Sequence, residues 1–204
     1  MSLTRVPDDE VATIVTSLQM LERPKPRPMA PSNLRLDRWR EPAPERYRAL
    51  FRRVGAPWLW FSRLVMDETA LLRIIHDPAV EIYAVTDARG IELGLLELDF
   101  REPGQAEISF FGLVPELTGQ GEGRWLMGHA LALCWRKGIA RVWVHTCTLD
   151  HPKALNFYRA QGFAPYARAV ETFADPRAAG LLPADVAPHI PLLSASSRRV
   201  STAT

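Results

Sequence analysis

The segment 118–124, Thr-Gly-Gln-Gly-Glu-Gly-Arg, is the part of the sequence whose residue types and spacing point most directly to chemistry. It lies between a predicted strand and a predicted helix. Glycine leaves backbone N–H groups open to the close approach of a ligand. The first N–H groups of a helix have no partner within the helix, and the helix dipole favours negative charge there. The segment is therefore a candidate phosphate-binding loop.

The loop fits neither of the common nucleotide-binding motifs. No Gly-Lys-Ser or Gly-Lys-Thr follows it, which excludes a P-loop. A dinucleotide fingerprint that began at Gly119 would need glycine where Arg124 stands. The sequence thus supports neither ATP nor NAD as the ligand. A tight strand-to-helix turn without any ligand stays open as the structural alternative.

A metal site is the second chemistry that the residue types suggest. His145 and Cys147 lie two positions apart on a predicted strand, so their side chains point to the same face, and His151 follows shortly after. No fourth ligand is near in the sequence, and the spacing matches no common zinc signature. We therefore predict no bound metal and interpret the three residues as part of a packed strand and its loop.

The elements around the loop alternate between strand and helix, with Gly162 ending the second helix. Gly112 stands near the end of the first strand, where glycine allows a bulge or a close backbone approach. Met127, Leu131, Cys134 and Trp135 recur at helical spacing and predict a buried helix face. The order is βαβαβ, with a strand over 106–114, a helix over 124–137, a strand over 141–148, a helix over 152–160 and a strand over 166–173.

The first half of the chain predicts two short helices and an antiparallel meander. Spacings of three and four between apolar residues indicate a helix over 44–54, and Asp67 is placed to cap the next helix, which Asp77-Pro78 ends. Glycine-containing turns join three successive apolar strands. The remaining elements are a strand over 11–21, a proline-rich linker over 23–31, and the meander strands over 81–86, 91–100 and 106–114.

The composition predicts one folded domain with tails. The chain has 204 residues, of which 47% are hydrophobic and 24% charged, which excludes global disorder and leaves no room for a second catalytic domain. A formal charge of +2 is too balanced for a dedicated nucleic-acid binder. Two cysteines form no disulfide framework, and no signal peptide or membrane-spanning run is evident. We expect a soluble, cytoplasmic protein that binds neither nucleic acid nor membrane.

Three segments together resemble the GCN5-related N-acetyltransferase (GNAT) family in order and spacing. They are the run from Gly112 to Met127, the strand from Val142 to Thr148, and Ala-Leu-Asn-Phe-Tyr-Arg-Ala-Gln-Gly-Phe over 154–163. The resemblance is specific over about residues 105–165 and compatible with the elements over 44–104. It implies a domain of the α/β class (α+β, with a mixed sheet). The central sheet is mostly antiparallel, is flanked by helices, and splits where acetyl-CoA enters.

The resemblance divides the chain and implies which residues hold coenzyme A. We expect an N-terminal strand and linker over 1–40, the acetyltransferase domain over 41–174 and a C-terminal tail over 175–204. The family's loop pattern, Gln/Arg-x-x-Gly-x-Gly/Ala, has Thr118 where Gln or Arg is usual, and His151 stands where the family usually has Asn. The loop would hold the pyrophosphate, while a strand edge would pair with the pantetheine amides. The implied residues are Gly112, Leu113, Thr118, Gly119, Gln120, Gly121, Glu122, Gly123, Arg124 and His151.

Two further residues match positions to which the family gives catalytic roles. Glu107, in Ala-Glu-Ile-x-Phe-x-x-Leu, is similar to the general base of the histone-type branch, and Tyr158 is similar to the acid that meets the leaving thiolate. A base would keep the attacking amine neutral, and a positioned hydroxyl would stabilise the developing charge on sulfur. For Glu107 the alternative is a solvated face or an ion pair, with His145 next in line as base. For Tyr158 the alternative is plain packing.

Other residues leave two interpretations open. Trp58, Trp60 and Phe61 either wall an acceptor pocket or pack in the core. Arginines 52, 53 and 63 either receive an acidic acceptor or form a solvated face, which is the default, and Glu116 is interpreted as solvated.

We expect an acetyl-CoA-dependent N-acetyltransferase that acts on a primary amine of a small molecule or peptide. The alternative is a non-catalytic acyl-CoA-binding module that has kept the fold. A hydrolase is disfavoured because the sequence has no Gly-x-Ser-x-Gly elbow. The acceptor stays open, as does the choice between a monomer and a homodimer.

Overall fold

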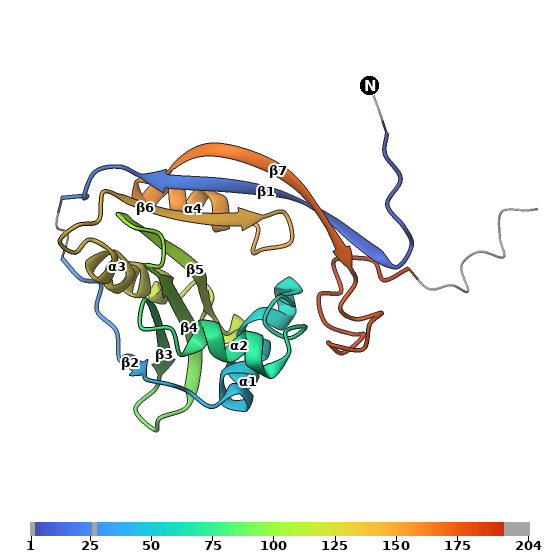
Figure 1. The fold of residues 1–204 in the computed structure, drawn as a ribbon, viewed down its shortest axis with the longest axis horizontal. Coiled ribbons are helices and arrows are strands. Elements are labelled where there is room, and N and C mark those ends of the chain that lie inside the picture. Colours follow the sequence, from blue (N-terminus) through green and yellow to red (C-terminus); the bar gives the residue numbers. More distant parts are fainter. Residues whose placement is uncertain (1–2, 26–27, 194–204) are drawn as a thin grey trace, which may run out of the picture.

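A computed structural model describes residues 3–25 and 28–193, which build one sheet of seven strands with helices on both faces (Figure 1). The strand order across the sheet is β2-β3-β4-β5-β6-β1-β7. The strands are β1 (Glu10–Met20), β2 (Arg35–Trp39), β3 (Val80–Thr86), β4 (Glu92–Asp99), β5 (Gln105–Leu113), β6 (Arg141–Cys147) and β7 (Ala164–Ala174). The helices are α1 (Pro44–Gly55), α2 (Glu68–Ile75), α3 (Glu122–Cys134) and α4 (Ala154–Gln161), with short 3₁₀ turns η1 (Ala56–Trp58) and η2 (Pro115–Leu117).

The predicted elements are confirmed, and the structure adds β2 and the two 3₁₀ turns, which the sequence did not predict. Strands β3, β4 and β5 form the expected antiparallel meander. The second half follows the expected βαβαβ order along the chain, but β6 and β7 are not neighbours. The N-terminal strand β1 lies between them and is antiparallel to both.

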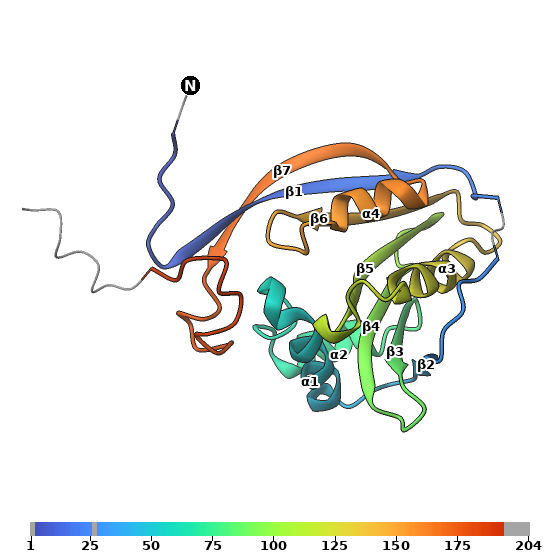
Figure 2. The same cartoon turned by 180° about the vertical axis from the view of Figure 1, so that it is seen from behind.

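The sheet splits between β5 and β6, the only neighbouring pair that runs parallel among the strands of residues 3–25 and 28–193. The two strands pair from Gln105–Arg141 to Ile108–Val144 and diverge beyond that point. Figures 1 and 2 show the split from both sides, with β6, β1 and β7 leaning away from β5. One edge of β5 is therefore left without a neighbouring strand over residues 109–113, as the predicted split sheet requires.

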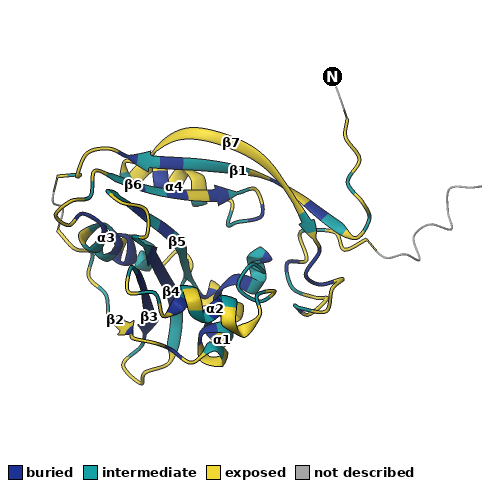
Figure 3. Cartoon of the chain, in the orientation of Figure 1, coloured by how far each residue is buried: buried dark blue, intermediate teal, exposed yellow. Residues whose placement is uncertain are grey.

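Two apolar clusters cover opposite faces of the sheet, because alternate strand residues point to opposite sides. Helix α3 packs on one face against the side chains of Leu96, Leu98 and Ile108. Met127 and Cys134 of this helix are fully buried, which confirms the predicted core face. Helices α1 and α2 cover the meander strands on the other face (Figure 3). Their buried residues are Tyr47, Leu50, Phe51, Val54, Leu71 and Ile75.

The α1–α2 connection is held by local signals that the sequence shows. The side chain of Asp67 caps α2 as predicted, because its Oδ1 accepts a hydrogen bond from the Ala70 N–H at 2.7 Å. Leu59, at the end of η1, is a non-glycine residue with positive φ (55°). This turn brings Trp60, Phe61 and Arg63 back toward the sheet.

The described part of the C-terminal tail folds back beside β1 and β7. Arg177 is buried, pairs with Asp175 and donates to the carbonyl oxygens of Val186, Ala187 and Ile190. Strand β7 itself is largely exposed (Figure 3). Residues 194–204 of the tail lie outside the described residues, as do 26 and 27 of the linker. The division into 1–40, 41–174 and 175–204 stays a prediction, although β1 and β2 share the sheet of the central segment.

In the ranges that the structure describes, no helix is long and apolar enough to cross a membrane.

Candidate active site

A cavity of about 730 Å³ opens where β5 and β6 diverge, and it extends from the glycine loop to the far side of the split. It brings together residues from both ends of the chain, including Thr13 of β1 and Phe173 of β7. Ten of the predicted site residues line it, namely Glu107, Gly112, Leu113, Thr118, Gly119, Gly121, Gly123, Arg124, His151 and Tyr158. The fold therefore gathers most of the predicted site in one space.

Two predicted site residues, Gln120 and Glu122, do not line this cavity. The Gln120 side chain donates to the carbonyl oxygen of Glu116 at 2.7 Å, and Glu116 is exposed as predicted. The Glu122 carboxylate accepts a hydrogen bond from Ser32 Oγ at 2.6 Å. Ser32 belongs to the segment between the proline-rich linker and β2, so this segment holds the carboxylate.

The glycine loop takes a conformation that requires glycine at two positions. Gly119 and Gly121 have φ of 82° and 88°, in the left-handed region. Gly123 is different, because it lies within α3, and an added Cβ would lie 3.7 Å from the Phe157 ring. Among the described residues, no acceptor contacts the backbone N–H groups of Gly121 and Gly123, as expected at a helix start. The loop thus offers open donors at the positive end of α3.

Two cations stand at the starts of the helices that border the loop. Arg124 lies in the first turn of α3, and Lys153 lies just before α4. Neither side chain has an ion-pair or hydrogen-bond partner within residues 3–25 and 28–193. His151 Nδ1 accepts from the Lys153 N–H at 3.1 Å, and its ring meets Trp58 edge-on at 5.4 Å. This end of the cavity therefore has two cationic side chains without a partner among the described residues.

The free edge of β5 begins at a bulge. Glu97 pairs with Phe110 and Leu98 with Ile108, so Ser109 is the extra residue. The bulge is thus at Ser109 and not at Gly112. Gly112 instead allows the close approach that the sequence analysis gave as the alternative, since an added Cβ would lie 2.6 Å from Val54 Cγ1.

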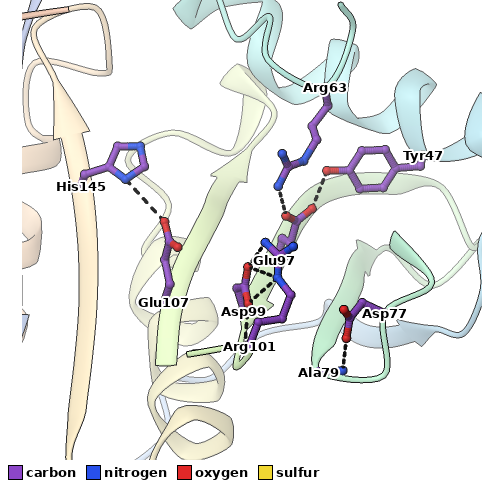
Figure 4. Close-up of polar contacts among 9 residues, drawn as sticks. All are labelled: Tyr47, Arg63, Asp77, Ala79, Glu97, Asp99, Arg101, Glu107 and His145. Carbon is purple, nitrogen blue, oxygen red and sulfur yellow. Dashed lines mark hydrogen bonds and ion pairs between the residues drawn. The ribbon is translucent and has the colours of Figure 1, made fainter. Parts of the chain in front are cut away.

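Glu107 lies on β5 at the opening of the split, with its carboxylate 3.7 Å from His145 Nδ1 on β6 (Figure 4). Burial, together with the negative charges of Asp99 and Glu97, raises the pKa of Glu107 to about 7. The cations Arg63 and Arg101 oppose that shift. Glu107 is therefore a carboxylate that gains and loses a proton near neutral pH.

A second cavity of about 370 Å³ adjoins the first and shares Glu107, Asp99 and Arg101 with it. Trp143 forms another of its walls. Asp99 is the cross-strand partner of Glu107 and is bound by the Arg101 guanidinium, which lowers the pKa of Asp99 against the effect of burial. Glu107 thus faces two spaces, one continuous with the glycine loop and one on the side of Trp143.

Behind Glu107 lies a buried ion pair. Glu97 is fully buried and accepts hydrogen bonds from the Tyr47 hydroxyl (2.5 Å) and from Arg63 Nη2 (2.6 Å), as Figure 4 shows. Burial and the charge of Glu97 hold the pKa of Tyr47 well above its ordinary value. The default interpretation of Arg63 as a solvated side chain is wrong, because its side chain is only 11% exposed. Arg52 and Arg53 are exposed.

Tyr158 is buried at the base of the cavity among the rings of Phe111, Phe157 and Phe163. Burial raises the pKa of its phenol, and the negative charge of Asp150 raises it further. No described residue forms a hydrogen bond with the hydroxyl. The phenol is therefore uncharged at neutral pH, and its oxygen is available to a ligand in the cavity.

The aromatic residues after α1 line the cavity and pack against other rings, and that they wall an acceptor pocket stays a prediction. Trp60 and Phe61 line the cavity, and each also packs: Trp60 against Phe110 at 5.1 Å, and Phe61 stacked on Phe173 at 4.3 Å between ring centres. Trp58 lines the cavity beside His151.

The sequence predicts no bound metal. Among the described residues there is no cluster of three or more His, Cys, Asp or Glu side chains that could hold one.

The sequence did not indicate Glu97, Asp99, Arg101 or Lys153 as site residues, although all but Glu97 line one of the cavities. Glu97 and Asp99 were visible only as two charges in an apolar strand. Their alternation in β4 places both on the face of the sheet that carries Glu107, but that placement depends on the register of β4 with β5.

A family model described as the acetyltransferase (GNAT) family matches residues 16–163 of this chain. No curated protein matches the sequence. The match begins within β1, ends just before β7, and includes Glu107, the glycine loop and Tyr158.

Solved structures share the fold at low sequence identity. A GCN5-related N-acetyltransferase from Sphaerobacter thermophilus aligns with a TM-score of 0.56 at 18% identity, over 80% of this chain and 52% of that one. An aminoglycoside acetyltransferase from an uncultured soil metagenomic sample aligns with a TM-score of 0.52 at 20% identity, over 64% of this chain and 88% of that one. This chain therefore spans about half the length of the Sphaerobacter protein.

Proposed function

This chain belongs to the GNAT acetyltransferase family, and we propose that it transfers an acetyl group from acetyl-CoA to a primary amine of an acceptor. The observation that carries the proposal is the single cavity that joins the glycine loop to Glu107 and Tyr158. This transfer needs open N–H groups, a carboxylate that titrates near neutral pH and an uncharged phenol. All of these groups border the same cavity.

The residues at the loop end fit coenzyme A. Gly119 has positive φ, and an added Cβ would meet nothing within 4 Å, so a ligand can approach this backbone closely. The N–H groups at the start of α3, with Arg124 and Lys153, would hold the pyrophosphate. The unpaired edge of β5 at Gly112 and Leu113 would bind the pantetheine amides in the manner of an added strand. Bound acetyl-CoA would supply the activated acetyl group.

Glu107 would remove the proton that prevents the acceptor amine from attacking. An alkyl ammonium has a pKa near 10, so almost no neutral amine is present at pH 7. A carboxylate with a pKa of about 7 is a stronger base than an ordinary glutamate and is still largely ionised at slightly alkaline pH. His145, 3.7 Å from this carboxylate, is the next candidate for the base.

Tyr158 would donate a hydrogen bond to the sulfur that leaves. Because burial keeps the phenol protonated, its O–H is present throughout the working pH range. A fixed donor in an apolar site stabilises developing negative charge without full proton transfer. The hydroxyl has no described partner to give up, so it is free to serve this purpose.

Screening amines for thiol release from acetyl-CoA tests the proposed function. The library should contain small alkyl amines, amino alcohols, aminoacyl amides, peptides with free N-termini and aminoglycosides, since one structure of similar fold is an aminoglycoside acetyltransferase. We expect acetyl-CoA-dependent turnover of at least one class. Tight binding of coenzyme A with no turnover of any amine would support the non-catalytic alternative instead.

A further inference from the structure

Arg63 lies in the cavity but has no part in the chemistry described above. Its Nη2 donates to Glu97 at 2.6 Å, and its guanidinium lies 5.0 Å from the centre of the Phe110 ring. Phe110 is the cross-strand partner of Glu97, next to the bulge at Ser109. The guanidinium is therefore fixed between a carboxylate and a ring, beside the strand that carries Glu107.

The second oxygen of Glu97 is occupied as well, by the Tyr47 hydroxyl at 2.5 Å. A fully buried carboxylate with both oxygens bound cannot rotate without losing one of these hydrogen bonds. Helix α1 thus fixes Glu97, and Glu97 fixes Arg63 (Figure 4). Such a chain of contacts is a means to hold one side chain in a defined orientation.

Arg63 has a donor that this network does not use. Its Nε is buried and has no hydrogen-bond partner in the described chain. Two other buried nitrogen atoms of the described chain also lack a hydrogen-bond partner, Arg48 Nε and Trp135 Nε1, but neither residue lines a cavity. That nitrogen of Arg63 is closed off from the cavity, but Arg63 Nη1 also has no partner in the described chain and is not fully buried, so an oxygen from a ligand in the cavity would accept a hydrogen bond from it.

The surrounding charges determine which kind of oxygen fits. Glu97 already balances the charge of Arg63, and the carboxylates of Asp99 and Glu107 lie close enough to interact with it. His145, Arg101 and Glu171 also line the cavity. The negative charge of a ligand carboxylate would be repelled by three carboxylates in this region. A neutral hydroxyl or carbonyl oxygen would not be repelled in this way.

We propose that Arg63 selects the acceptor by donating a hydrogen bond to a neutral oxygen close to the amine that Glu107 deprotonates. The inference rests on the proposed function and narrows it. The favoured acceptors are amines with a hydroxyl or carbonyl group on the neighbouring carbon, as in an amino alcohol or an N-terminal residue of a peptide. Plain alkyl amines and amino acids with a free carboxylate are poorer acceptors.

Four amines of similar size test the proposal: 2-aminopropan-1-ol, alaninamide, 2-aminobutane and alanine. The variant Arg63→Lys keeps a cation beside Glu97 and removes the guanidinium donors. We expect kcat/KM for the first two amines to fall at least tenfold in the variant, and kcat/KM for 2-aminobutane to change less than threefold. Each ratio compares one amine between two proteins, so differences in amine basicity cancel.

Arg48→Lys is the matched control. Arg48 is also a partly buried arginine with a buried, unpartnered Nε–H and one hydrogen bond from Nη2, to the Met66 carbonyl oxygen, but it lies outside the cavities. We expect this variant to treat all four amines as the wild-type protein does. The two oxygen-bearing amines also distinguish the two kinds of acceptor. A larger loss of kcat/KM for alaninamide in Arg63→Lys indicates a peptide-like acceptor, and a larger loss for 2-aminopropan-1-ol indicates an amino alcohol.

The wild-type protein alone supplies a measurement that does not depend on whether a variant folds. Per neutral amine, kcat/KM for 2-aminopropan-1-ol should exceed that for 2-aminobutane at least tenfold. If none of the four is a substrate, the best library acceptor is compared with its analogue in which CH₂ replaces the nearest oxygen. Equal losses for all amines in Arg63→Lys, or no preference in the wild type, would overturn this inference alone. No turnover of any amine would overturn the proposed function.

Discussion

The two ends of the cavity differ in charge and in how the chain builds them. The loop end has open N–H groups and two cations, Arg124 and Lys153, that have no partner in the part of the chain that the structure describes. At the other end, Arg63 and Arg101 are each paired with a carboxylate, which leaves Glu107 as the group whose proton is loosely held. The first end is suited to an anion that arrives fully charged, and the second to a cation that loses a proton.

The ends also differ in their origin along the chain. The loop end comes mostly from one continuous segment, 118–124, with Lys153 added from the start of α4. The other end combines residues of α1, the α1–α2 connection, β4, β5 and β6. A continuous segment can be recognised in a sequence, whereas a site built from five elements appears only when the chain is folded.

Replacing Glu107 should lower activity more than any other change proposed here, and it should impair the acceptor end of the cavity alone. In Glu107→Gln we expect kcat to fall about a hundredfold at neutral pH, because the acceptor ammonium loses its base. The affinity for coenzyme A should stay within twofold by calorimetry, since the loop is untouched. An unchanged rate with an unchanged pH profile would place the base elsewhere, with His145 the next candidate.

Replacing Gly121 should break the loop end alone. In Gly121→Val we expect coenzyme A to bind ten- to hundredfold more weakly, because the side chain crowds the open N–H groups and opposes a φ of 88°. Gly138→Val is the matched control, since Gly138 has a φ of 92° with open space around it and lies outside the cavity. Equal affinity in the folded Gly121 and Gly138 variants would contradict the loop assignment.

Removing the Tyr158 hydroxyl should lower turnover less than replacing Glu107 does. This change acts where the two ends of the cavity meet. Tyr158→Phe keeps the ring among its aromatic neighbours and removes one oxygen, so the free energy of unfolding should change little. We expect kcat to fall about tenfold under conditions where chemistry limits the rate. Wild-type turnover in this variant would show that Tyr158 only packs.

The smallest effect concerns stability rather than turnover. The pKa of Glu107 is about 7 in the folded protein against an ordinary value of 4.5, so between these values the folded state binds more protons than the unfolded state. Stability therefore falls as pH rises through this window. Glu107→Gln removes the fall, and we expect it to be more stable than the wild type above pH 7 by about 1 to 2 kcal/mol. Below pH 4.5 the two proteins should unfold alike, as chemical denaturation at pH 4 and pH 8 would check.

Local signals made much of the fold predictable. Capping by Asp67, the apolar spacing in α1 and the glycine turns of the meander each act within a few residues, and each is confirmed. The position of β1 between β6 and β7 was not predictable in this way, because its partners lie more than a hundred residues away in the sequence. The short strand β2 has five residues without an apolar alternation of its own and depends on β3 for its pairing.

The candidate site divides along the same line. The loop glycines, Glu107 and Tyr158 were indicated by sequence, and the fold gathers them in one cavity. Arg63 was misread as a solvated side chain because nothing near it in the sequence shows that Glu97, on another element, buries it. Its role depends on a long-range contact, and so does the charge difference between the two ends.

A crystal structure with coenzyme A and 2-aminopropan-1-ol tests the division between the two ends most directly. We expect the pyrophosphate against the N–H groups that follow Gly121, the thiol between Tyr158 and Glu107, and the amine on the Glu107 side of the split. A pyrophosphate bound away from the glycine loop, or an amine bound at the loop end beside Arg124, would contradict the account.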